Sequence, residues 1–513
     1  MCKIAQGHTP HGGITTLNSE QRSPARNTEW WIAIRLFATV YLFCLLCMDS
    51  SPHGVFTVVN RFQYIAYALI EDHTIDISGV EKSYGNVTDV YEVRGRRVQP
   101  VNPGVSLLVT PAYGLSSLMS VEERIGALAG LDAVIAYQGF IFALALNAPL
   151  TAVFVVSLWL TLRWLGLTRR LSLFLAIWMT WGSMAAYYFT AGTNVQTAAE
   201  TALTTVAWLF IVGVECNRNR GARVPMFLAG LFLGLAILVN VPALLTVVFT
   251  FFYVIIRHRM MIWIFITGLI PGTAVLLIYQ WIALGNPFMD IPFAFFQSAG
   301  LYRLPDEVSF VDVALEFLAG WHQGLIWYFP LVTCLVFSLR NRKFVVSLSA
   351  VCWMLIIGHW LFASWYTHLW TRTSVQISSW PWHAAPGPGG PRYLLPIIPF
   401  VAVLIAQLDF RSAHLRTWMS WMGVLGLSLN IPILMYPAGG PVFRSFLLML
   451  KHGMNVPLAR AVAQVIQSEA TVFVSDATIL LTWAAVIIGF ALWIWKSARF
   501  RDWVFDGYIV DSV

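Results

Sequence analysis

Charged side chains are scarce in this chain of 513 residues. Asp, Glu, Lys and Arg make up 11% of it, whereas a soluble globular protein carries about 25%. The sequence contains no HExxH, GxGxxG or GxxxxGKS/T pattern and no pair of CxxC motifs. It also lacks the internal repeat that symmetric transporters show. These absences exclude a soluble protein, and they leave no loop of known type that would bind ATP or a dinucleotide.

The chain instead contains long hydrophobic runs. Hydrophobic residues make up 58% of the chain, and its mean hydropathy is +0.69. A helix needs about 20 mostly apolar residues to cross a bilayer, and about twelve segments qualify. They are 30–48, 134–162, 171–190, 198–215, 225–239, 241–256, 260–284, 325–339, 344–364, 393–408, 417–436 and 478–495. The two short segments beside Asn240-Val241-Pro242 are either separate crossings or one broken hairpin. We therefore predict an all-α polytopic membrane protein.

Basic residues indicate the orientation of these helices. With twelve crossings the Lys and Arg clusters all fall on one side, which the positive-inside rule identifies as the cytoplasm. The clusters are Arg22/Arg26, Arg163/Arg169/Arg170, Arg218/Arg220/Arg223, Arg257/Arg259, Arg340/Arg342/Lys343, Arg411/Arg416 and Lys496/Arg499/Arg501. The net charge of +7 thus reflects topology, and we expect no nucleic-acid partner.

The orientation divides the chain into two short tails and one large domain. Residues 1–29 and 496–513 are predicted to be cytoplasmic tails, and 30–495 the transmembrane domain. Four long segments lie on the other side and contain most of the acidic residues; they are about 49–133, 285–324, 365–392 and 437–477. We therefore expect the functional site on the non-cytoplasmic face of a plasma or inner membrane.

Two stretches of the first outer loop, 49–133, favour helices. Apolar residues recur at helical spacing through Val55–Ile75, which predicts an amphipathic helix along the membrane interface. The apolar run Gly104–Met119 follows Pro103 and predicts either a second interfacial helix or a short dip into the membrane. A full crossing there would invert every later loop and break the charge pattern.

Carboxylates and arginines share this first outer loop. Any single carboxylate is most often a solvated surface group, but together they are the first candidates for acid–base work. They are Asp49, Glu71, Asp72, Asp76, Glu81, Asp89 and Glu92. Arg94, Arg96 and Arg97 suit a phosphorylated lipid, because Arg binds phosphate through paired hydrogen bonds. Ordinary attraction to anionic headgroups is the alternative of equal weight.

A second candidate region follows the glycine-rich turn Gly387–Pro391. The turn brings Arg392 and Tyr393 to the outer end of a membrane helix, where an Arg is costly unless it pairs or reaches the interface. A phosphate at the outer leaflet would pair with Arg392. A role for Arg392 as an interfacial anchor is an alternative of equal weight. Trp382 offers an aromatic face to a sugar, although lining the interface is the more common role. His322 starts another helix, where a lone His is more often an interfacial residue than a ligand.

Five segments in one order carry a resemblance to a known family. They are Asn60–Leu69, Gly95–Pro111, Ala229–Pro242, Gly324–Pro330 and Gly390–Tyr393. Their order and the topology resemble the GT-C superfamily of membrane glycosyltransferases, and more closely its branch of protein O-mannosyltransferases and lipid A aminoarabinose transferases. The resemblance implies a GT-C-like fold of about twelve helices with interfacial helices in the outer loops. It also implies inverting transfer of a sugar from a polyprenyl phosphate to a hydroxyl of a glycan, lipid or protein acceptor.

The resemblance also implies roles for particular residues. In that family a carboxylate of the first outer loop removes the acceptor proton, because a hydroxyl is too weakly acidic to ionise first. The family's usual Asp stands where this chain has Asn60-Arg61, and an Asn is no useful proton acceptor. We therefore predict Asp89 as the base, with Asp49 second and Asp76 third.

Phosphate and substrate residues complete the predicted site. Arg or Lys stabilises the charge on the leaving phosphate. We assign the donor phosphate to Arg392, Tyr393, Arg61 and Arg96, and the substrate to Asn60, Asn102, His322 and Trp382. The family includes members with and without a divalent ion, so both remain open, and no other cofactor is indicated. Membrane lipids are the remaining expected partners. A transporter or flippase and a non-catalytic lipid-binding protein are the rival hypotheses, and Asn60 keeps the second of them open.

Overall fold

The computed structural model of the protein describes residues 23–47, 60–85, 90–99, 102–129, 131–190, 195–216, 222–288, 309–340, 348–373, 391–436, 442–452 and 504–505. Helices dominate these residues. The one sheet among them is a hairpin of β1 (Tyr91–Val93) and β2 (Arg96–Val98). The all-α prediction is therefore confirmed.

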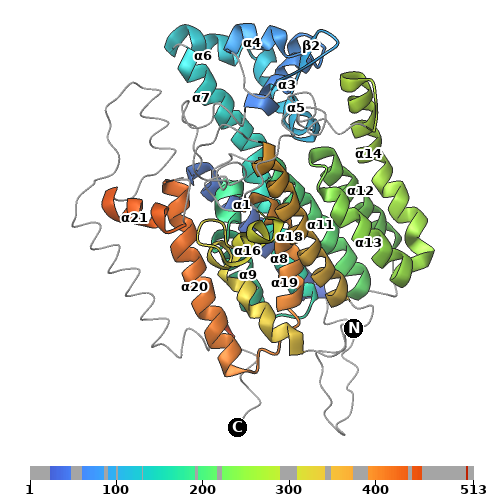
Figure 1. Ribbon diagram of the computed structural model, residues 1–513, viewed down its shortest axis with the longest axis vertical. Helices are drawn as coiled ribbons and strands as arrows, with labels where there is room; N and C mark the ends of the chain where they lie inside the picture. Colours follow the sequence, from blue (N-terminus) through green and yellow to red (C-terminus); the bar gives the residue numbers. More distant parts are fainter. Residues whose placement is uncertain are drawn as a thin grey trace.

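A bundle of helices forms the body of the molecule (Figure 1). Its elements are α1 (Ser23–Cys47), α7 (Leu131–Phe142), η2 (Ala143–Asn147), α8 (Ala148–Trp164), α9 (Arg169–Trp181), α10 (Ala185–Thr190), α11 (Val195–Cys216), α12 (Arg223–Val239), α13 (Ala243–His258), η3 (Arg259–Met261), α14 (Ile262–Leu284), α16 (Phe310–Ala319), α17 (Leu325–Tyr328), η4 (Pro330–Arg340), α18 (Leu348–Thr373), η6 (Arg392–Ile397), α19 (Ile398–Ile405), α20 (Ala413–Met435) and α21 (Val442–His452).

Several of these helices are long and apolar enough to cross a membrane. Five segments of the described chain meet both conditions: Tyr137–Trp164, Val195–Cys216, Ala243–Leu284, Leu348–His368 and Ala413–Leu434. Each coincides with one or two of the predicted segments. The chain is therefore an integral membrane protein, while the predicted segment 478–495 lies outside the described residues.

Three predicted segments are interrupted in the structure. The segment 171–190 becomes α9 and α10, because α9 ends at Gly182 where the backbone of α20 comes close. The segment 325–339 becomes α17 and η4, which meet at Pro330, and 393–408 becomes η6 and α19. Proline removes a backbone donor and crowds the preceding turn, which accounts for the break before Pro330.

A cap covers one end of the bundle (Figure 1). We use this name for the described residues between 60 and 129, which form α3 (Asn60–Glu71), α4 (Ser78–Tyr84), the hairpin, α5 (Gly104–Leu118) and α6 (Val121–Ala129). α3 falls within the predicted helix Val55–Ile75, and α5 matches Gly104–Met119. A bend of 65° separates α5 from α6, so the two do not form one straight crossing.

An ion pair joins two helices at the other end of the bundle, which we call the basal end. Arg163, at the end of α8, pairs with Glu29 near the start of α1 at 2.7 Å. At the opposite end of these two helices the Tyr41 hydroxyl donates to the Leu144 carbonyl at 3.0 Å. α1 and α8 therefore run antiparallel, with Glu29 and Arg163 at the basal end.

Glycines bring α12 and α14 into close contact. Gly230 and Gly234 of α12 face Gly268 and Gly272 of α14, in two GxxxG arrangements on parallel helices. A Cβ on Gly234 would lie 2.6 Å from the Leu269 carbonyl oxygen, and one on Gly272 would overlap the Gly234 backbone. Small residues let membrane helices approach closely enough for their backbones to pack. We call this contact the glycine seam.

A methyl group added to the glycine seam should destabilise the protein. In Gly272→Ala the new Cβ meets backbone, which cannot move aside, and overpacking of this kind costs about 1–3 kcal/mol. Gly114→Ala in α5 is the matched control, because its Cβ would lie 4.0 Å from its nearest neighbour, Ile70. Thermal unfolding in detergent should show a lower midpoint for Gly272→Ala alone. Equal midpoints for the two variants would contradict the packing.

Candidate functional site

Arg392 opens η6 and lies half-buried among tyrosines. Its Nη2 donates to the Tyr393 hydroxyl at 2.7 Å, and its guanidinium carbon lies 4.7 Å from the centre of the Tyr393 ring. The Tyr366 ring of α18 meets the Tyr393 ring nearly at right angles, with 4.9 Å between centroids. The buried Tyr188 of α10 lies close enough to interact with the charge on Arg392.

The guanidinium of Arg392 has bonding capacity to spare. A guanidinium carries five N–H donors and a permanent positive charge. Among the described residues its Nε is buried without a hydrogen-bond partner, and no carboxylate there pairs with it. A buried cation without a counter-charge is costly. This arrangement therefore favours an anion beside Arg392.

Arg392 lies toward the capped end of the bundle. From Arg392 the chain descends through α19 to the start of α20. α20 runs parallel to α9, since Gly423 packs on Trp178 and Gly426 on Gly182. α9 starts beside Arg163 at the basal end, so α20 starts there too. The top of η6 consequently lies at the end of the bundle that the cap covers.

Asp76, between α3 and α4, holds the hairpin in the cap. Its Oδ1 accepts hydrogen bonds from the Ser78 N–H at 3.0 Å, the Ser78 hydroxyl at 2.6 Å and the Arg97 N–H at 3.2 Å. Partial burial acts to raise the pKa of Asp76, but these hydrogen bonds and the nearby Arg96 outweigh it and lower the pKa. A carboxylate with a lowered pKa accepts protons poorly, so Asp76 suits a structural role better than that of a base.

The three arginines of the hairpin have different surroundings. Arg97 pairs with Glu81 of α4, with 2.9 Å between Nε and Oε2. The Arg94 side chain lies against Gly285 at the C-terminal end of α14, where positive charge is favourable. Arg96 is exposed. Arg96 is therefore the member of this group best placed to reach a phosphate.

A tyrosine network around Glu122 joins the cap to α7. Glu122 accepts hydrogen bonds from the Tyr67 hydroxyl, from the Tyr84 hydroxyl at 3.4 Å and from Gln138 Nε2 at 3.1 Å. The Tyr113 hydroxyl donates to the Gln138 carbonyl at 2.9 Å. Burial raises the pKa of both Tyr67 and Tyr84, which keeps these phenols protonated. The sequence analysis missed this network because its members come from five separate helices.

Glu200 is a fully buried carboxylate inside α11 that the sequence analysis also missed. Its Oε2 accepts a hydrogen bond from the Asn240 side chain at 2.6 Å, and its Oε1 has no partner among the described residues. Gln196, one turn earlier, donates to the Val239 carbonyl at 2.8 Å. A carboxylate within a membrane helix is costly and marks a functional position by default. The position of this charged residue within the predicted apolar segment 198–215 is the sequence signal that could have identified it.

Asn102 is buried where the cap meets the bundle. Its exposed fraction is 1%, and its Oδ1 has no hydrogen-bond partner within the described chain. Two residues later, Gly104 packs so closely on α12 that a Cβ would lie 2.7 Å from the Val239 nitrogen. Asn102 and the Glu200–Asn240 pair therefore belong to the same region of the capped end.

His322 lies in the turn between α16 and α17, next to Glu316. The Glu316 Oε1 accepts the His322 N–H at 2.9 Å and the Gln323 N–H at 3.1 Å, and it lies 3.8 Å from the His322 ring Nδ1. Glu316 thus closes this turn through three contacts. In the structure His322 helps to form this turn, and its predicted role in substrate binding remains a prediction.

Several predicted site residues cannot be placed. Asp49, Asp89 and Trp382 lie outside the described residues, and only the backbone of Asn60 and Arg61, at the start of α3, is described. Within the described parts of the chain, no three His, Cys, Asp or Glu side chains come together to hold a metal ion.

Comparison with solved structures identifies the fold. The crystal structure of ArnT from Cupriavidus metallidurans bound to undecaprenyl phosphate is similar over 92% of this chain and 74% of its own, with a TM-score of 0.51 and 14% sequence identity. The chain has a GT-C fold. This confirms the fold class predicted from the five sequence segments. No family model and no curated protein matches the sequence.

Within the GT-C fold, the hydrogen bonds of Asp76 should stabilise the cap in a pH-dependent way. Because the pKa of Asp76 is lowered by folding, its contribution is present at neutral pH and is lost as the pH falls below the ordinary Asp value of 3.8. Asp76→Asn should lower the free energy of unfolding by about 1–3 kcal/mol at pH 7. The gap to the wild type should narrow near pH 3.

Unfolding followed by tryptophan fluorescence from pH 3 to pH 7 measures this effect. Asp72→Asn, at an exposed position in the same loop, is the control and should change little. A variant Asp76→Asn that keeps full stability but loses activity would instead assign Asp76 to the chemistry.

The Glu200–Asn240 hydrogen bond should be essential for stability. Glu200→Gln keeps an oxygen that accepts from Asn240, whereas Glu200→Ala leaves a buried donor unpaired at a cost of about 1–3 kcal/mol. Denaturation in mixed detergent micelles should rank the wild type and Glu200→Gln above Glu200→Ala. Equal loss in both variants would show that the charge, rather than the hydrogen bond, is what matters.

Proposed function

We propose that the protein transfers a sugar from a polyprenyl-phosphate donor to an acceptor hydroxyl, with inversion at the anomeric carbon. Arg392 carries this proposal, because its guanidinium lies at the capped end without a counter-charge among the described residues. The similar ArnT structure holds undecaprenyl phosphate, a ligand whose phosphate would complete such a site. The Tyr393 ring lies against the guanidinium, and the Tyr366 ring packs on the Tyr393 ring.

The proposed reaction is a single displacement. A carboxylate of the first outer loop, for which Asp89 remains the first candidate and Asp49 the second, takes the proton of the acceptor hydroxyl as its oxygen attacks the anomeric carbon. The bond from that carbon to the phosphate oxygen breaks, and the electron pair stays on the phosphate. Arg392 stabilises this growing charge through its spare N–H donors, and the Tyr393 hydroxyl holds the guanidinium in place.

The charge distribution supports the side of the membrane on which transfer takes place. The basal end carries Arg163, Arg169 and Arg170, which by the positive-inside rule would face the cytoplasm. The cap and Arg392 would then face the non-cytoplasmic side. A lipid-linked sugar at the outer leaflet could reach Arg392 with its phosphate while its isoprenoid chain stays in the bilayer.

Sugar transfer by the purified protein tests the proposal. Radiolabelled polyprenyl-phosphate sugars are supplied with candidate acceptors, in Mg²⁺ and in EDTA. Arg392→Ala should lower kcat about 10²–10³-fold, as the loss of one group that stabilises developing charge does. Arg392→Lys should recover part of it, because a lysine keeps the charge but not the paired geometry. Arg223→Gln, an exposed arginine of the basal end, should leave transfer unchanged.

The base assignment is tested separately in the same assay. Asp89→Asn should abolish transfer, and undiminished transfer by that variant would reject Asp89 without affecting the role of Arg392. Donor binding without transfer by the wild type would favour the rival, a lipid-binding protein without catalysis. No binding of any polyprenyl phosphate would contradict the proposal altogether.

A further inference from the structure

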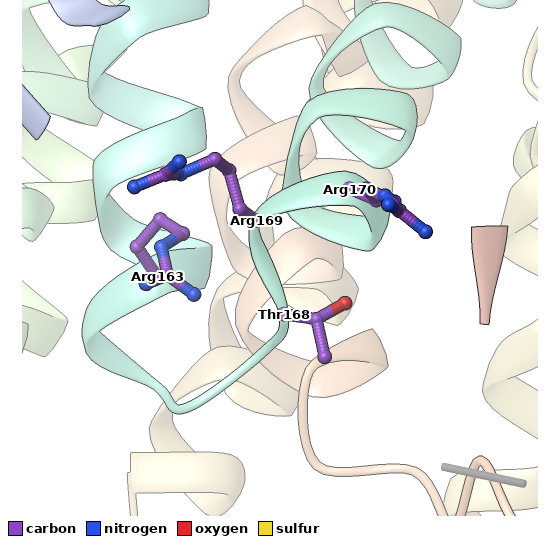
Figure 2. Close-up of a pocket in the computed structure, with 4 residues that line it drawn as sticks. All are labelled: Arg163, Thr168, Arg169 and Arg170. Atoms are coloured by element: carbon purple, nitrogen blue, oxygen red, sulfur yellow. The ribbon is translucent and has the colours of Figure 1, made fainter. Parts of the chain in front are cut away.

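A second basic site lies at the basal end, remote from the cap. A cavity of about 320 Å³ is lined by Arg163, Thr168, Arg169 and Arg170 (Figure 2). Ligand pockets span about 300–1,000 Å³, so this one is the size of a small headgroup rather than of a whole lipid-linked sugar. Three arginines line it: the Arg169 side chain lies over Arg163, and the Arg170 side chain extends to the other side of the turn (Figure 2). The proposed transfer reaction uses none of them.

The turn between α8 and α9 builds the cavity. α8 ends at Trp164, and Gly166 adopts the left-handed conformation (φ +96°) that lets the chain reverse. The Thr168 side chain then accepts a hydrogen bond from the Leu171 N–H and starts α9. The first two residues of α9, Arg169 and Arg170, thereby lie next to the turn that follows Arg163, the last basic residue of α8.

Arg163 is fixed in place before any ligand arrives. Its Nε and Nη2 both donate to Glu29 Oε1, at 3.2 and 2.7 Å, and its Nη1 donates to the Leu167 carbonyl. Arg169 projects over Arg163 on the same side of the turn (Figure 2). Within the described chain Glu29 pairs with Arg163 and no carboxylate pairs with Arg169. At Arg169 the cavity therefore offers a positive charge without a carboxylate partner in the described chain, beside the wall that Arg163 and Glu29 form.

We propose that this cavity binds the phosphate of an anionic phospholipid in the leaflet opposite the cap. Guanidinium groups recognise phosphate through paired, charge-assisted hydrogen bonds. The ends of membrane-spanning helices lie at the level of the headgroups, and anionic lipids concentrate there next to basic residues. A lipid bound at this turn would connect α1, α8 and α9, since Glu29 already ties α1 to Arg163 of α8.

Lipid binding by the full-length protein in detergent tests the assignment. Native mass spectrometry is recorded with phosphatidylglycerol, with phosphatidylcholine and with inorganic phosphate. Phosphatidylglycerol should remain bound, and Arg169→Gln/Arg170→Gln should weaken its binding about tenfold, as expected for lost hydrogen bonds between charged groups. Arg223→Gln is the matched control, because it removes an exposed arginine from the same end outside the cavity.

Each other outcome would overturn the proposal. Equal weakening by Arg223→Gln would show general charge attraction rather than a site. Binding of inorganic phosphate but not of phosphatidylglycerol would assign the cavity to a soluble phosphate. Unchanged lipid binding by the double variant would show that Arg169 and Arg170 do not bind the lipid. None of these results bears on the sugar transfer assigned to Arg392.

Discussion

The hydrocarbon core of a bilayer offers no water, so a polar group inside it must find its partner within the protein. Helices meet this requirement for the backbone, which accounts for their dominance here. Buried side chains meet it by pairing, as the Thr246 hydroxyl and His359 Nε2 do at 2.9 Å. Arg392 and Glu200 keep unused bonding capacity among the described residues. Both lie in the half of the bundle nearer the cap, and this is why function is assigned there.

The fold was largely predictable because it follows from local hydrophobic pattern. Runs of apolar residues mark α11 and α14 to within a few residues, and helical spacing marks α3. The interruptions in 171–190 and 325–339 were not predicted. They depend on a neighbouring helix backbone at Gly182 and on the proline at 330, whose effects an average hydropathy does not reveal.

The site was predictable only where one residue is informative by itself. Arg392 stands out because a guanidinium at the edge of an apolar helix is expensive, and the structure shows it among tyrosines without a carboxylate in the described chain. Asp76 looked like any other loop carboxylate, and only its bonds to Ser78 and Arg97 reveal a structural task. The partner of Glu200 lies 40 residues away along the chain, a separation that no local pattern encodes.

The glycine seam has a mechanical consequence. It locks α12 and α14 together, α5 abuts the end of α12 at Gly104, and the hairpin abuts the end of α14 at Gly285. The cap therefore rests on the ends of two helices that are packed tightly against each other. Because the two helices cannot slide past each other, any change in their packing would move α5 and the hairpin together.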